Sequence, residues 1–167
     1  MTTEERLALL RKTYRESDIF TQYLGYTRVR RQRLNFMRAY VNNPRGAFSA
    51  RLRRAYAEAY LLENMAPVIH PGERIVGLPD ISPLTEEEQE EYRELEKAMR
   101  AAPDTGPLTI GHMALDYPKL LHVGVSGLLK EIRGRRAALD KNEPESLPKE
   151  EFYEGCEAEL EALGTLA

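Results

Sequence analysis

The sequence predicts a mainly helical chain, and three observations carry that expectation. Apolar residues recur every three or four positions over most of the 167 residues, which is the period of an amphipathic helix. Clusters of turn-forming residues such as Asn42 to Gly46 separate these stretches. Only Pro67 to Gly77 has two short apolar pieces around a Pro-Gly turn, a pattern typical of extended structure. We therefore expect helices joined by loops, with at most a short β segment near residues 67–77.

We expect the first three helices at residues 3–16, 28–41 and 48–65. Each has an apolar stripe on one face: Leu7, Leu10 and Tyr14 in the first, Val29, Phe36, Met37, Tyr40 and Val41 in the second, and Leu52, Tyr56, Ala59, Leu62 and Met65 in the third. Pro67 ends the third helix, because proline has no N–H for the helical hydrogen bond. We expect the first helix to dock on the rest through its short stripe.

The remaining helices are expected at residues 85–101, 117–138 and 148–163. Thr85 and Glu88 have the spacing of a capping box, and the acidic run that follows predicts a largely solvated helix. Asp116 and Pro118 mark the start of the next helix. The stripes of the last two helices are Leu121, Val125, Leu128 and Ile132, and Phe152, Cys156, Leu160 and Leu163.

Two glycines, Gly124 and Gly127, lie inside the expected helix 117–138. A glycine in a helix interior costs about 1 kcal/mol relative to alanine. We expect that the helix approaches another backbone closely at these positions.

The composition excludes several classes of protein. With 42% hydrophobic and 31% charged residues, the chain is suited to one folded domain. Its apolar runs are far shorter than the ~20 residues of a membrane span, and its polar start lacks the core of a signal peptide. We therefore expect a cytoplasmic protein. A single cysteine, Cys156, excludes an internal disulfide, and three histidines leave little material for a structural zinc site.

The charges are distributed unevenly along the chain. Residues 1–60 contain 13 Lys and Arg against 5 Asp and Glu, net +8, whereas residues 61–105 have a net charge of −7 and residues 106–167 of −4. The basic cluster between Arg28 and Arg38 could contact nucleic acid, or the opposite charges could meet within one body or on a larger partner. No helix-turn-helix spacing or zinc finger accompanies the cluster, so the sequence favours an acid-paired or solvated helix face.

Cys156 and His112 are the two residues that could carry chemistry. Neighbouring carboxylates raise the pKa of a thiol, and Cys156 lies on the expected apolar stripe, so we expect a packing residue there. His112 precedes a helix start, where polar side chains often meet ligands. From spacing alone, a histidine that orders its loop by local hydrogen bonds is the favoured interpretation. We assign no catalytic residue and no metal ligand.

Three segments in this order resemble the glycyl radical enzymes of the pyruvate formate-lyase type. They are Arg54 to Ile69 with Gly72 to Gly77, then Gly111-His112 with Asp116 to Leu121, Gly124 and Gly127 to Glu131, and finally Phe152 to Ala158. The resemblance covers most of residues 30–165 and concerns the amino-terminal part of the family. It implies that residues 1–167 form one partial domain, the helical amino-terminal portion of an enzyme with a ten-stranded α/β barrel.

The resemblance also implies a function for the parent enzyme, a radical C–C or C–O lyase or dehydratase acting on a small polar substrate in an oxygen-free cytoplasm. Its glycyl radical would be installed by an activating enzyme that uses S-adenosylmethionine. In the diol-dehydrating branch, the histidine matched by His112 contacts a substrate hydroxyl, so His112 is the expected substrate-binding residue. The family's reactive cysteine stands in a Gly-Cys-x-Glu loop, whereas Gly155-Cys156 is followed by Ala158 in place of that glutamate.

We therefore expect this chain to be inert alone and to carry no cofactor, because the thiyl cysteine and the radical glycine have no match in it. The expected partners are the remainder of the enzyme, the activating enzyme and a small-molecule substrate. A homodimer of the parent is compatible with this interpretation, whereas a membrane or nucleic acid is not expected. The alternative is a stand-alone helical interaction or regulatory module, which either binds nucleic acid through Arg28 to Arg38 or regulates a larger enzyme as a truncated relative.

Overall fold

A computed structural model describes residues 1–21, 27–47, 49–65, 67–74, 78–101 and 116–165. The chain is mainly helical, which confirms the expected fold class. Its helices and strands are α1 (Thr3–Glu16), β1 (Ile19–Thr21), β2 (Thr27–Val29), α2 (Arg30–Asn42), α3 (Ala50–Glu63), β3 (Pro67–Val68), β4 (Leu78–Pro79), α4 (Glu86–Ala101), α5 (Tyr117–Ala137) and α6 (Ser146–Thr165).

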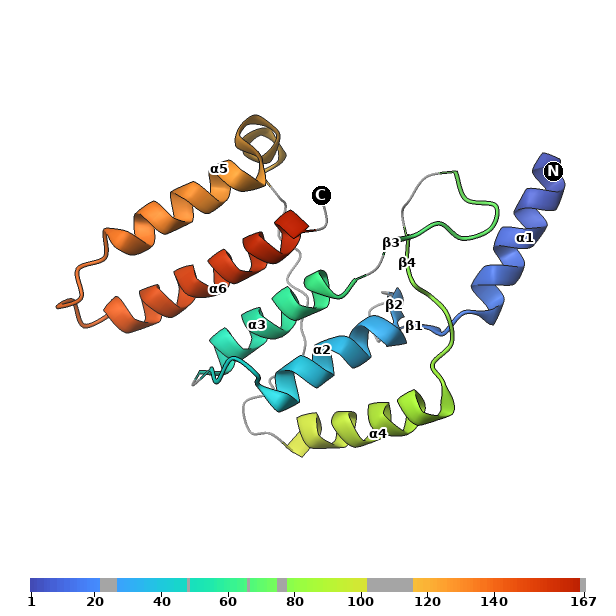
Figure 1. Cartoon of the computed structure of the whole chain (residues 1–167), viewed down its shortest axis with the longest axis horizontal. Helices are drawn as coiled ribbons and strands as arrows, with labels where there is room; N and C mark the ends of the chain where they lie inside the picture. The colour runs from blue at the N-terminus through green and yellow to red at the C-terminus, as the bar shows by residue number, and fades with distance from the viewer. Residues whose placement is uncertain (22–26, 48, 66, 75–77, 102–115, 166–167) are drawn as a thin grey trace.

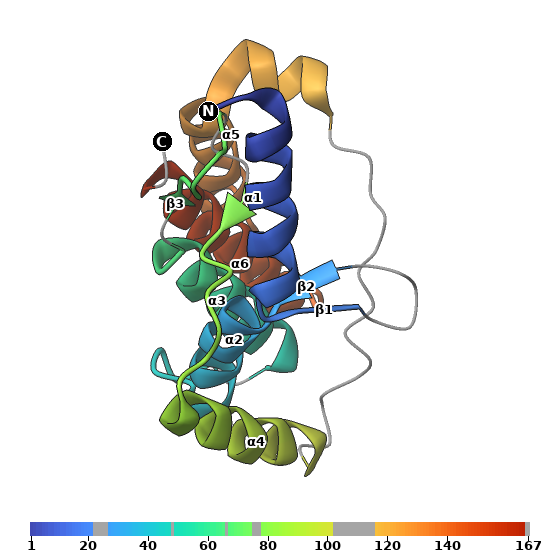
Figure 2. The same ribbon diagram turned by 90° about the vertical axis from the view of Figure 1, so that its right-hand side faces the viewer.

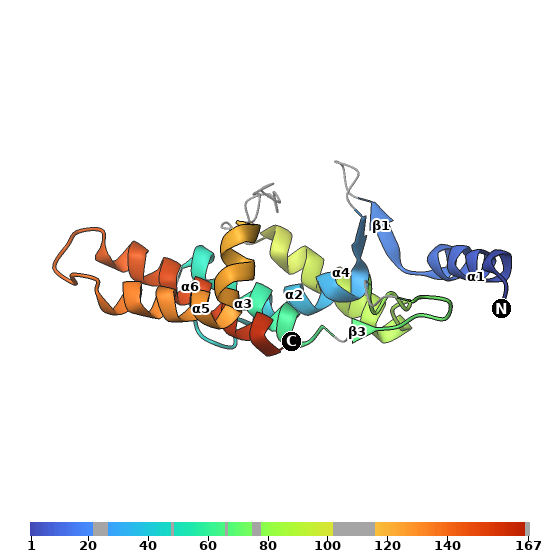
Figure 3. The same ribbon diagram turned by 90° about the horizontal axis from the view of Figure 1, so that it is seen from above.

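Five helices lie side by side in the spatial order α4, α2, α3, α6, α5 (Figure 1). The same order is visible from the side in Figure 2, where α5 and α4 form the two ends of the row. Helix α1 projects away from this row beyond the strands, as the view from above shows (Figure 3). The order differs from the chain order because α4 returns to α2, and α6 rather than α5 packs against α3.

The strands form two short antiparallel pairs. Strand β3 pairs with β4 through Pro67 and Pro79 and through Val68 and Leu78, close to the expected segment at residues 67–77. Strand β1 pairs with β2 through residues 19–21 and 27–29. The sequence interpretation missed this second pair and extended the following helix back over residue 28. Strand pairing thus overrides the helical period at Arg28 and Val29, and α2 begins at Arg30.

Local hydrogen bonds explain where several helices begin and end. Thr85 and Glu88 form the expected capping box, with the Glu88 N–H donating to Thr85 Oγ1 at 3.2 Å and the Thr85 N–H to Glu88 Oε2 at 2.9 Å. Asp116 accepts from the Lys119 N–H at 3.1 Å and so caps α5. At the end of α2, Asn43 adopts the left-handed conformation with φ of 43°, which asparagine tolerates better than most residues.

Two small clusters form the core of the row. One joins α2, α3 and α4 and consists of Phe36, Met37, Ala39, Tyr40, Ala57 and Met99. The other joins α3 and α6 and consists of Ala59, Ala158 and Ala162. The apolar stripe expected for α2 is therefore buried as the sequence indicated. Helix α4 was expected to be largely solvated, but one face packs on α2 through Met99, Tyr92 and Leu95.

Helix α6 contacts α3 through a face that differs from the expected stripe. Phe152 and Leu163 are 54% and 38% exposed, whereas Gly155, Ala158 and Ala162 are buried. The apolar period of the sequence pointed to the larger residues. Close approach of two helices instead favours small side chains at the contact. A Cβ added at Gly155 would lie 2.9 Å from the Cβ of Ala55, which shows how tightly the two helices pack.

Helix α5 is kinked at Gly124, which has φ of 66° and ψ of 179°. A Cβ at Gly124 would meet nothing within 4 Å, and one at Gly127 would lie 2.7 Å from Cβ of Val123 in the same helix. The expectation of close contact with another backbone was therefore wrong for the described residues. The kink also displaces Leu121 from the expected stripe, and this side chain is 84% exposed.

Candidate functional site

The predicted substrate-binding residue, His112, lies outside the described residues. The described chain resumes at Asp116, whose side chain caps α5. The first turns of α5 place Tyr117 and Leu121 at the surface, 59% and 84% exposed. The segment that follows His112 is therefore a capped helix start with large apolar side chains that nothing in the described chain covers.

Ion pairs join the C-terminal end of α5 to α6. Arg133 Nε lies 2.6 Å from Glu157 Oε1, and Arg133 also contacts Glu161. Arg136 lies 2.7 Å from Glu154 and 3.0 Å from Glu157. The hydrogen bond from Arg133 holds the pKa of the Glu157 carboxyl below its usual value. These charged contacts fix the hairpin, because α5 has no buried residue in the described part of the chain.

Cys156 is half-buried inside α6. Burial raises the pKa of its thiol, and the nearby Glu159 carboxylate adds to the increase. A raised pKa keeps the thiol protonated and therefore a poor nucleophile. This direction agrees with the prediction that Cys156 is a packing residue and not a reactive one.

The Glu159 carboxyl is a titratable group that the sequence interpretation did not single out. Burial against α3, together with the charge of Glu58, raises its pKa to about 7, and Arg54 opposes the increase. Arg54 Nε donates to Glu58 Oε1 at 3.0 Å. Nothing in the sequence distinguishes Glu159 from the four other glutamates that lie within eight residues of it in α6. Its burial could therefore not be predicted.

The basic cluster of α2 faces the acidic helix α4. Arg31 donates to both carboxylate oxygens of Glu88, at 2.6 and 3.1 Å. Arg38 donates to both oxygens of Glu91, at 2.8 and 2.5 Å. These hydrogen bonds raise the pKa of Arg38 and lower the pKa of Glu88 and of Glu91. The opposite charges of the two chain segments therefore meet within one body, as the sequence interpretation favoured.

These ion pairs weaken the nucleic-acid alternative, which relied on Arg28 to Arg38. Nucleic-acid affinity comes largely from cations that reach phosphates, whereas α4 carboxylates already pair with Arg31 and Arg38. Arg30 Nε lies 3.2 Å from Asp18, and Arg33 lies 3.5 Å from Glu96. The side chain of Arg28 lies outside the described residues, although its backbone pairs with Phe20 in the strand pair.

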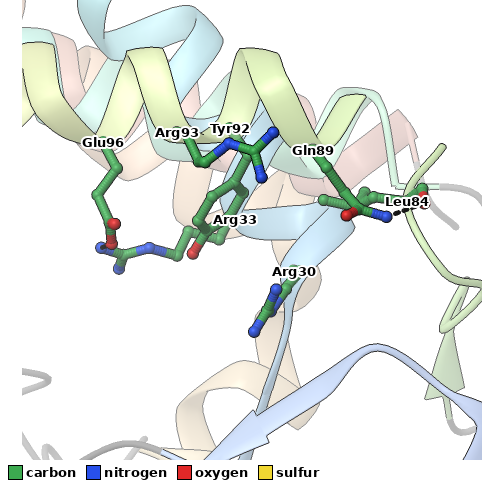
Figure 4. Close-up of a pocket in the computed structure, with 7 residues that line it drawn as sticks. All are labelled: Arg30, Arg33, Leu84, Gln89, Tyr92, Arg93 and Glu96. Carbon is green, nitrogen blue, oxygen red and sulfur yellow. Dashed lines mark hydrogen bonds and ion pairs between the residues drawn. The ribbon is translucent and has the colours of Figure 1, made fainter. Parts of the chain in front are cut away.

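A cavity of about 400 Å³ opens between α2 and α4, and we refer to it as the arginine pocket (Figure 4). Its lining consists of Arg30, Arg33, Leu84, Gln89, Tyr92, Arg93 and Glu96. The Gln89 side chain donates to the Leu84 carbonyl at 2.9 Å, and the guanidinium of Arg30 lies 5.9 Å from the Tyr92 ring centroid. Three guanidinium groups thus share one opening with a single carboxylate.

The sequence interpretation missed this pocket, although it had noted Arg30 and Arg33. Its α4 side follows from a helical period, since Gln89, Tyr92 and Glu96 recur at intervals of three and four residues. The sequence does not indicate that α2 packs against α4. This packing brings the arginines of α2 close to the pocket residues of α4. That pairing depends on contacts between residues more than fifty positions apart.

Two negative findings apply to the described residues. Within the described ranges, no helix is both long enough and apolar enough to cross a membrane. In the same part of the chain, no group of three or more His, Cys, Asp or Glu side chains has the arrangement of a metal site.

Comparison with known proteins shows which family part of the chain resembles. The sequence model of the pyruvate formate lyase-like family matches residues 86–167. The (2S)-3-sulfopropanediol dehydratase of Klebsiella oxytoca is 40% identical over 52 residues, which are 31% of this chain and 6% of that enzyme. The match thus spans a small part of the relative's length, and no solved structure matches the chain significantly. Residues 86–167, just under half of the chain, thus resemble the pyruvate formate lyase-like family.

Proposed function

We propose that the chain is a helical scaffold segment of a larger glycyl radical lyase or dehydratase that acts on a small polar substrate. The observation that carries this proposal is the family match over residues 86–167, which include α4, α5 and α6. The similarity to a dehydratase supports dehydration of a hydroxylated substrate as the reaction class. The proposal treats residues 1–167 as one partial domain that docks on the remainder of the enzyme.

The exposed start of α5 supports docking. Tyr117 and Leu121 are more than half exposed, and Val123 is 36% exposed. Exposed apolar groups that cluster on one element often mark an interface. The Gly124 kink turns this first part of α5 away from the contact with α6, and it directs the apolar side chains to a surface that the remainder of the enzyme would cover.

We further propose that this segment does not carry the reactive cysteine. Cys156 lies within the helix α6, not in a loop, and its thiol has a raised pKa. In the proposed enzyme, the radical glycine, the thiyl cysteine and the contact with an S-adenosylmethionine-dependent activating enzyme would belong to other parts. The segment would then be inert alone and would act in the cytoplasm of cells grown without oxygen.

His112 is the proposed substrate contact of this segment, on the basis of its match to the family's glycine-histidine motif. An imidazole can hydrogen-bond a substrate hydroxyl or supply a proton to a departing oxygen. The cap at Asp116 supports this assignment, because it fixes the helix that begins five residues after His112.

A chimera tests the proposal. Residues 86–167 would replace the matching part of the Klebsiella oxytoca dehydratase, and the chimera would be activated without oxygen. We expect an electron paramagnetic resonance signal of the glycyl radical and measurable dehydration of (2S)-3-sulfopropanediol. A folded chimera that accumulates no radical would contradict the scaffold role.

His112→Ala in the same chimera tests the substrate contact separately. His122→Ala is the matched control, since His122 is exposed on α5. We expect His112→Ala to keep the radical signal and to lower turnover by about 100-fold, within the range typical of an acid–base group, while His122→Ala leaves both unchanged. Equal turnover in the two variants would refute the role of His112.

A further inference from the structure

We propose that the arginine pocket between α2 and α4 binds a small organic phosphate. This inference goes beyond the proposed function and does not depend on it, because the pocket lies on the α2–α4 contact and its lining includes none of the residues discussed on α5 and α6. A cavity of about 400 Å³ lies within the size range of small-molecule sites, ~300–1,000 Å³.

The pocket lining has a net positive charge, which favours an anionic ligand. Three arginines face one glutamate, and that glutamate also lies 3.3 Å from Arg100 outside the pocket. Arginine presents five N–H donors in a planar fork that matches phosphate oxygens. A phosphate monoester has three terminal oxygens and about two negative charges near neutral pH, so it can accept from several guanidinium groups at once. A ligand with one carboxylate has only two oxygens and one negative charge, so it can accept from fewer of these guanidinium groups.

The acids around the pocket leave donors for such a ligand. Asp18 contacts Arg30 through Nε at 3.2 Å, so the described contact does not involve the two terminal nitrogens of Arg30. Arg93 pairs with Glu90 within α4, and both side chains are more than 60% exposed. Pairs this exposed contribute little energy and can rearrange. At Arg93, an anion that enters the pocket therefore competes with a weak contact.

The pocket also offers apolar surface for an organic group. The Tyr92 ring lies between the arginines in Figure 4. Burial raises the pKa of the Tyr92 hydroxyl, so the phenol stays neutral and does not repel an anion. An inorganic phosphate would contact the arginines alone, whereas a phosphate ester would also cover this ring.

The experiment is calorimetric titration of the full chain with glycerol 3-phosphate and with inorganic phosphate, at constant ionic strength. We expect saturable binding of both, with glycerol 3-phosphate the tighter ligand. The variant Arg30→Gln/Arg93→Gln should bind at least about tenfold more weakly, since it removes two charged groups that donate hydrogen bonds to the phosphate oxygens. Both side chains are exposed, so this variant should fold.

Arg51→Gln/Arg135→Gln is the matched control, because it removes the same charge from exposed positions on α3 and α5. It should bind both probes as the unchanged chain does, and circular dichroism verifies that both variants remain helical. The proposal is wrong if neither probe binds, if the control loses as much affinity as the pocket variant, or if the pocket variant keeps its affinity. Equal affinity for the two probes would refute the organic part of the proposal.

Discussion

Replacing Gly124 with alanine tests whether the kink in α5 is required. With φ of 66° and ψ of 179°, Gly124 occupies a backbone region that residues with a Cβ almost never adopt, at a cost of about 1–3 kcal/mol. Space is not the cause, because an added Cβ would meet nothing within 4 Å. We therefore expect Gly124→Ala to lower the free energy of unfolding by about 1–3 kcal/mol.

The matched control is Gly134→Ala in the same helix. Gly134 also has no atom within 4 Å of an added Cβ, and its φ is not positive. Here alanine should stabilise the chain by about 0.5–1 kcal/mol through helix propensity. Thermal unfolding by circular dichroism resolves the difference, since 1 kcal/mol shifts Tm by about 2–4 °C in a domain of this size. If both variants stabilise the chain equally, the kink is not a feature of the fold.

Three further predictions concern α6. Gly155→Ala should destabilise the chain, because the added Cβ would lie 2.9 Å from the Cβ of Ala55. Gly164→Ala is the control and should not destabilise it, because an added Cβ there would meet nothing within 4 Å. Equal melting temperatures of the two variants would argue against the close contact of α3 with α6. The Glu159 pKa of about 7 lies above the unfolded value, so the folded state retains a proton that the unfolded state releases. Stability should therefore fall as pH rises from about 4.5 to about 7, and Glu159→Gln should remove this decrease; an unchanged pH profile would refute it. The Cys156 thiol should react with iodoacetamide more slowly than a model thiol at the same pH, and equal rates would contradict its raised pKa.

The sequence predicted the helices well, because each has an apolar period and most have capping residues. Thr85 with Glu88 and Asp116 with Pro118 identified helix starts from local chemistry alone. The pair of β1 and β2 was missed because residues 19–21 and 27–29 contain too few alternating positions to show a strand period.

The errors on α5 and α6 have a different origin. The prediction assumed that the most hydrophobic residues of α6 face the core. The close contact between α3 and α6 has room only for small residues, so Gly155 is buried while Phe152 is exposed. A glycine at position 124, inside a helix, was explained by close packing. The structure shows that glycine is required there by the backbone conformation, and not by close packing. The arginine pocket could not be predicted, because it depends on which two helices pair.

The contact of α4 with α2 and the contact of α6 with α3 should respond differently to salt. Helix α4 contacts α2 through a small apolar cluster and through bidentate pairs such as Arg38 with Glu91, whose side chains are 32% and 41% exposed. Salt screens pairs of this exposure. The contact of α3 with α6 depends instead on buried Ala59, Ala158 and Ala162, which salt does not screen. Raising the salt concentration should therefore increase amide hydrogen exchange in α4 before it does so in α6.

A double-mutant cycle of Arg38→Ala and Glu91→Ala should give a coupling of about 0.2–1 kcal/mol that declines with salt. If the coupling is zero at low salt, the Arg38–Glu91 pair does not help to hold α4 in place, and this part of the contact depends on packing at Met99 and Tyr92.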